Sequence, residues 1–176
     1  MYRCRCKICK RIYTKILIMK KISNIQFYFS NKFKSKIFLD KICLFFSEKL
    51  NTEIILQNLD DYESLFFNEN VDIYYQIVTE NTENLFSTSI RLVLHNDWIK
   101  DIFDYFDFID ELSQATSEQL IIPIGDTSYD YLLFDSEKKY FIIEENGQNQ
   151  KGGIEFYSRK KVSKFESREI VKKYYI

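Results

Sequence analysis

The chain has 176 residues, 45% of them apolar and 29% charged, which is the composition of a globular protein with one buried core rather than of a disordered chain. Its formal net charge of −1 conceals three zones: residues 1–39 hold eleven Lys/Arg and no acid, residues 40–137 have a net charge of −17, and residues 138–176 have a net charge of +5. An acidic middle zone of this size disfavours nucleic acid and anionic membranes as partners and attracts basic proteins.

The N-terminal residues 1–18 are interpreted as a basic extension that takes no part in the fold. Met19 is followed by Lys20-Lys21 and then by the first strand-like run, which is typical of a start site. Lys15 interrupts the apolar residues that a signal peptide would need, and no run reaches the roughly 18 apolar residues of a membrane span. We therefore expect a cytoplasmic protein.

Three cysteines in the same segment, Cys4, Cys6 and Cys9, have the spacing C-x-C-x-x-C. A closed zinc site needs four ligands, and the remaining candidates, Cys43 and the single histidine His95, are far along the chain. We expect no metal or other cofactor, and free thiols in a reducing compartment.

The first part of the domain is predicted to be a strand at 25–29, a helix at 33–50, a short strand at 53–56 and a longer strand at 71–78. The helix is indicated by apolar residues that gather on one side. These residues are Ile37, Phe38, Ile42, Phe45 and Phe46.

The second part repeats this order. We predict a strand at 89–95, a helix at 98–115, and strands at 120–124, 129–134 and 140–144 with a hairpin turn at 135–139. Pro123 predicts an edge strand or a bulge. One further strand is expected at 154–157, and a short helix near the end of the basic tail 158–176.

The order of these elements predicts an α+β fold in a single domain, residues 19–176. We expect a two-layer sandwich in which two main helices pack on a mostly antiparallel sheet. Each half of the domain is predicted to have the order strand, helix, strand, strand.

The helix at 98–115 is the most informative segment for function. Its acids are predicted to lie on the face opposite Trp98, Ile102 and Phe106, and Lys100 is the only base among them. Like charges three or four residues apart destabilise a helix by about 0.2–0.5 kcal/mol per pair, so we hypothesise that a basic partner neutralises this face. The acids are Asp97, Asp101, Asp104, Asp107 and Glu111.

A second acidic cluster surrounds the apolar run Leu65-Phe66-Phe67. Aromatic side chains flanked by charges are typical of protein interfaces, where the aromatic residues supply affinity and the charges supply rate and specificity. A short helix that covers the sheet is the competing interpretation. The predicted partner-binding residues in this loop are Asp60, Asp61, Glu63, Phe66 and Phe67.

The sequence therefore predicts a non-enzymatic protein-binding module whose acidic surface masks a basic partner. An immunity protein that neutralises a nuclease-type toxin is one example. A first alternative is a small carboxylate-based, metal-dependent enzyme around His95 and Asp97, which lie together at a strand-to-helix junction. A second alternative is a nucleic-acid accessory protein that binds through its basic tails.

Overall fold

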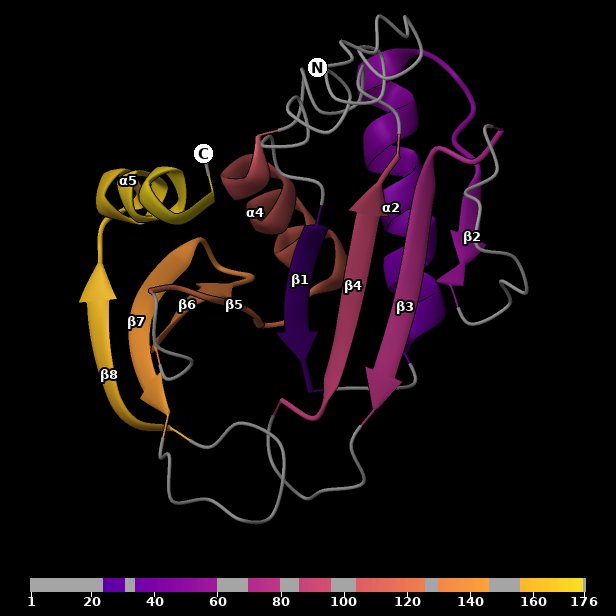
Figure 1. Ribbon diagram of the computed structural model, residues 1–176. Coiled ribbons are helices and arrows are strands. Elements are labelled where there is room, and N and C mark those ends of the chain that lie inside the picture. The colour runs from indigo at the N-terminus through magenta and orange to yellow at the C-terminus, as the bar shows by residue number, and fades with distance from the viewer. Residues whose placement is uncertain are drawn as a thin grey trace, which may run out of the picture.

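The structure is a computed structural model that describes residues 24–30, 34–59, 70–79, 86–95, 104–125, 130–145 and 156–175. The described residues form three helices and one eight-stranded sheet, which confirms the predicted α+β class (Figure 1). The predicted extension 1–18 and its cysteines lie outside the described residues.

All pairs of neighbouring strands in the sheet are antiparallel except β2 and β3, which are parallel. The strand order across the sheet is β2-β3-β4-β1-β5-β6-β7-β8. In chain order the strands are β1 Asn24–Phe29, β2 Leu56–Asn58, β3 Ile73–Thr79, β4 Thr88–Leu94, β5 Leu120–Pro123, β6 Asp130–Asp135, β7 Lys139–Glu145 and β8 Phe156–Val162.

The helices are α2 Ser35–Leu50, α4 Tyr105–Thr116 and α5 Lys164–Tyr175. Figure 1 shows α2 and α4 behind β3, β4 and β1. The buried apolar side chains of all three helices belong to one core cluster, so the helices cover the same face of the sheet. Within that layer α4 packs against α2 and against α5.

The two predicted halves are present as β1-α2-β2-β3 and β4-α4-β5-β6. Because β1 and β3 are both antiparallel to β4, and β4 and β5 are both antiparallel to β1, each half contains a pair of parallel strands joined through a helix. The two units interleave in the order β3-β4-β1-β5, which is the connectivity of the split β-α-β, or ferredoxin-like, motif. The motif by itself carries no functional assignment.

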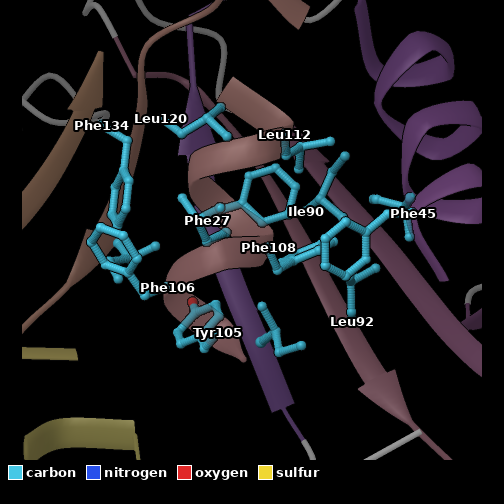
Figure 2. Close-up of a cluster of buried hydrophobic side chains, with 14 of the residues drawn as sticks. Phe27, Phe45, Ile90, Leu92, Tyr105, Phe106, Phe108, Leu112, Leu120 and Phe134 are labelled. Atoms are coloured by element: carbon cyan, nitrogen blue, oxygen red, sulfur yellow. The ribbon is translucent and has the colours of Figure 1, made fainter. Parts of the chain in front are cut away.

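The core is aromatic and centres on α4. Phe108 packs on the α2 side, with ring centroids 5.0 Å from Phe45 and 5.5 Å from Phe46. Phe106 packs on the other side, 5.3 Å from Phe134 of β6 and 5.5 Å from Tyr140 of β7. Figure 2 shows these two side chains leaving α4 in different directions. The helix therefore connects both halves of the sheet.

The opposite face of the sheet buries a second, smaller apolar cluster. Successive residues of a strand point to opposite faces, and both Ile121 and Ile122 of β5 are fully buried, one in each cluster. The buried members of this second cluster are Phe86, Ile121, Tyr131, Leu133 and Ile143.

The junction between β1 and β5, which we call the β1–β5 seam, has the shortest ladder in the sheet, with Tyr28 and Ile121 as its one pair of Cα partners. The sequence predicts an edge or a bulge at Pro123: β5 as a whole lies between β1 and β6, but Pro123 itself is paired on the β6 side only and is a local edge. Proline is tolerated there because the β1 ladder has ended, and Pro123 pairs only with β6. Two tyrosine hydroxyls bind carbonyls at this seam: Tyr105 donates to Gln26 over 3.0 Å, and Tyr175 donates to Pro123.

Several predicted boundaries need correction. The predicted helix at 98–115 begins at Tyr105 in the structure, because Asp104 has an extended backbone conformation (φ −102°, ψ 111°). The strand predicted at 53–56 lies at Leu56–Asn58, and the strand predicted at 154–157 is the longer β8. The helix predicted in the basic tail is α5, a main helix of 12 residues.

Candidate functional site

The later start of α4 changes the role of its first acids. Asp104 is the N-cap, and its Oδ1 accepts a hydrogen bond from the backbone N–H of Asp107 over 3.0 Å. Asp107 lies in the first turn, where the positive end of the helix dipole favours a negative charge. Both acids therefore stabilise α4, whereas the sequence pattern predicted that they destabilise it.

The same two acids contact a base from the C-terminal tail. Arg168 of α5 places Nη1 3.2 Å from Oδ2 of Asp104, and its Nη2 donates to Oδ1 of Asp107. Its guanidinium carbon also lies 5.0 Å from the centroid of the Phe106 ring. A planar guanidinium is suited to bridging two carboxylates while it stacks on a ring.

A third acid of α4, Asp110, is almost fully buried at 4% exposure. It accepts a hydrogen bond from the hydroxyl of Tyr140 over 3.0 Å and one from Nζ of Lys164, in α5, over 3.1 Å. Burial and the hydrogen bond to Asp110 raise the pKa of Tyr140 well above its usual value of 10.0, so the phenol remains protonated and keeps donating.

These contacts overturn the premise that the acids of this helix lack compensating bases. The bases come from the positively charged C-terminal zone, more than fifty residues along the chain. The predicted site residues Asp104 and Asp107 lie together beneath Arg168 of α5, but Phe106, which the pattern placed on the opposite face, lies beside them under the same guanidinium. Arg168, Lys164, Asp110 and Tyr140 were missed by sequence reasoning. A usable signal was the spacing Lys164–Arg168, which places two bases on one side of a helix that follows the capping sequence S-x-x-E.

Glu111, the last of the five acids predicted to bind a partner, faces α2 instead. Its side chain is 56% exposed, and its Oε1 lies 3.8 Å from Nζ of Lys49. Lys49 also lies 4.3 Å from the centroid of the Phe45 ring. The lysine therefore combines a carboxylate contact with an aromatic one.

Glu111 borders a shallow groove between α2 and α4, which we call the α2–α4 groove. Glu48 and Glu111 are the carboxylates of its lining, and Leu44 is an apolar residue that remains 46% exposed. Such a groove can take a lysine or arginine, whose methylene stem covers apolar surface while its charged end meets a carboxylate. The lining residues are Lys41, Leu44, Phe45, Glu48, Glu111, Leu112 and Ala115.

The other predicted binding residues lie outside the described residues. They are Asp97 and Asp101, which precede α4 in the sequence, and Asp60, Asp61, Glu63, Phe66 and Phe67, which precede β3 in the sequence. The partner-binding prediction for these positions stays a prediction.

The alternative enzymatic site was predicted around His95 and Asp97, and of these two residues the structure describes His95. Its backbone N–H donates to the carbonyl of Asp72 over 2.9 Å, and its ring lies edge-on to Tyr74 at 5.9 Å between centroids. The carboxylate of Asp72 accepts a hydrogen bond from the backbone N–H of Ile55 over 3.0 Å. Asp97, the proposed companion of His95, is outside the described residues.

The described residues contain one cysteine, Cys43. Burial and then the charge of Asp40 raise the pKa of the Cys43 thiol, which lowers the fraction of reactive thiolate. In the described parts of the chain, three or more metal-binding side chains do not converge anywhere. None of the described helices is long and apolar enough to cross a bilayer.

Comparison of the chain with protein families, curated proteins and solved structures finds no match.

Proposed function

We propose that this chain is a non-enzymatic protein-binding module of the cytoplasm whose acidic surface binds a basic partner. An immunity protein that neutralises a nuclease-type toxin is one example of this class. The proposal rests first on the excess of acid in residues 40–137. Electrostatic attraction of this kind accelerates association with a basic partner and selects against acidic ones.

The observation that carries the proposal is the seating of basic side chains along α4. Arg168, Lys164 and Lys49, from two different helices, each contact a carboxylate of α4 and lie over a core phenylalanine. The combination of carboxylate and aromatic ring recurs on both sides of the helix. It is the chemistry that a lysine or arginine of a partner would meet.

The accessible part of this surface is the α2–α4 groove. Leu44 supplies exposed apolar area at its edge, and Glu48 and Glu111 supply charge. A basic residue of the partner could replace Lys49 at Glu111, because their separation of 3.8 Å is loose for an ion pair and both side chains are partly exposed.

The test is a capture experiment from extracts of the native host, with three immobilised proteins. The wild type is compared with the double variant Glu48→Lys/Glu111→Lys and with Glu137→Lys, an exposed charge reversal in the distant β6–β7 turn. We expect the wild type and Glu137→Lys to capture the same basic protein and the double variant to lose it. The on-rate of the purified partner should fall about tenfold or more in the double variant, with a flatter salt dependence.

The proposal fails if the double variant captures the same proteins as the wild type, or if the captured proteins are acidic. Circular dichroism and thermal melting of all three proteins must agree closely, so that a loss of capture reports on the surface and not on unfolding.

A further inference from the structure

The helix α5 is attached to the rest of the protein in an unusual way. Of its 12 residues, only Ser167 and Val171 are buried, whereas eight of the 12 residues of α4 are. The hydroxyl of Ser167 donates within its own chain segment, to the carbonyl of Ser163. The apolar attachment of α5 is thus Val171 with the partly buried Ile170 and Tyr175.

The start of α5 is defined by its own residues. Ser163 and Glu166 form a capping box: the backbone N–H of Glu166 donates to Oγ of Ser163 over 3.2 Å, and the backbone N–H of Ser163 donates to Oε2 of Glu166 over 2.8 Å. Ser163 is also the one residue between β8 and α5. The helix therefore begins without help from the surface on which it lies.

The ionic contacts that α5 makes with other elements are all to one surface of α4, which we call the α5 site, whereas the hydroxyl of Tyr175 donates to Pro123 of β5. The α5 site consists of the carboxylates of Asp104, Asp107 and Asp110 and the ring of Phe106. Lys164 and Arg168 are one helical turn apart, and their charged groups lie 5.6 Å and 5.0 Å from the centroid of that ring. In Figure 2 Phe106 and Tyr105 lie on the side of α4 nearest to α5 (yellow).

If α5 left this surface, the three carboxylates would lose Lys164 and Arg168, and the ring of Phe106 would be uncovered. Tyr105 would also lose its contact with Tyr175. Tyr105 packs edge-on against Tyr175 at 4.4 Å between centroids. A surface of that composition fits a helix that carries two cationic side chains four residues apart, with an aromatic residue near its end. Among the described helices, α5 itself meets this requirement.

We infer that the α5 site is a receptor for a basic helix, that α5 occupies it in cis, and that a partner's helix with lysine or arginine at positions i and i+4 replaces α5. The identity of the replacing helix rests on the proposed function, whereas the release of α5 does not. The contacts of Arg168 with Asp104 and Asp107 join partly exposed groups and are weakened by salt, and α5 is the described helix with the fewest buried residues. Its release is therefore the least costly opening of the described helices.

The experiment uses the full chain and a fluorescently labelled peptide with the sequence of residues 163–175, SKFESREIVKKYY. Arg168→Glu should release α5, because the new carboxylate would face Asp104 and Asp107. We expect this variant to bind the peptide at least tenfold more tightly than the wild type, and the binding to weaken at about 1 M salt. Lys172→Glu is the matched control, since Lys172 contacts Glu169 within α5 and should leave binding at the wild-type level.

Two further measurements keep the inference falsifiable. A peptide that itself carries Arg168→Glu should not bind. Should Arg168→Glu fail to fold, hydrogen exchange of the wild type decides the question: at about 1 M salt the α5 amides should lose protection while those of α4 keep it.

The inference is overturned if the peptide binds wild type and variant equally or not at all, or if α5 stays as protected as α4 at high salt. Because the peptide assay contains no natural partner, a positive result together with failed capture from extracts would reject the proposed function alone. The reverse outcome would reject the displacement of α5 alone.

Discussion

The two neighbours of α4 are held to it by different forces. On the α2 side Phe108 meets Phe45 and Phe46, all of them buried. On the α5 side the principal contacts are those of Arg168 and Lys164 with carboxylates. Moderate salt leaves hydrophobic contacts unchanged but weakens partly exposed ion pairs. The interface of α4 with α2 should therefore be insensitive to salt, and we call it the permanent interface. The interface of α4 with α5 should respond to salt, and we call it the adjustable interface.

The largest expected effect comes from breaking the permanent interface. Phe108→Ala should lower the free energy of unfolding by about 3–5 kcal/mol, the usual range for truncating a buried phenylalanine. Urea denaturation measures the change, and the loss should be the same at low and high salt. A loss below about 1 kcal/mol would mean that the α2 side is not packed as described.

A smaller effect is expected at the buried end of the adjustable interface. Asp110→Ala leaves the hydroxyl of the buried Tyr140 without its acceptor, which should cost about 1–3 kcal/mol. Combining it with Tyr140→Phe should cost less than the two single changes added together, because the phenol then has no proton to satisfy. Strict additivity in urea denaturation would contradict this pairing.

Substitutions at Asp104 distinguish its role as the N-cap of α4 from its ion pair with Arg168. Asp104→Ala should cost about 1 kcal/mol through loss of the N-cap, while Asp104→Asn keeps an oxygen acceptor and should cost less. Asp104→Lys relieves repulsion between like charges but should still cost at least as much as the alanine variant, because it removes the cap and places a cation beside Arg168. Equal stability of the lysine variant and the wild type would mean that relief of like-charge repulsion outweighs the loss of the cap.

The smallest effect is a pH dependence confined to α5. Hydrogen bonds from the backbone N–H and hydroxyl of Ser163 lower the pKa of Glu166 below its ordinary value of 4.5. As the pH falls, Glu166 is therefore protonated in the unfolded chain before it is protonated in the folded chain. Its contribution to stability is complete above about pH 4.5 and disappears as the pH falls through the folded pKa. Hydrogen exchange should show α5 opening more readily near about pH 3 than near about pH 6, and Glu166→Gln should reduce the difference.

The sequence was sufficient for what depends on local pattern. Alternating and helical apolar periods predicted the order of elements and the buried position of Phe106. The start of α4 was missed because Trp98 and Ile102 continue the apolar period, so Asp104 was assigned to a helix face although it also has the chemistry of an N-cap. The strand order and the contact of Arg168 with Asp104 could not be predicted, because both involve residues that are far apart in the sequence. An apolar period relates only residues that are close together in the sequence.

The β1–β5 seam also determines the order in which the protein can be assembled on the ribosome. The strands β5 to β8 form a meander of local hairpins, but β1 can pair only after β4 has been synthesised, and its second edge closes only with β5. Pairings between strands that are far apart in the sequence slow folding, and an open strand edge is a template for aggregation. A nascent chain that stalls between β4 and β5 would therefore expose one edge of its central strand.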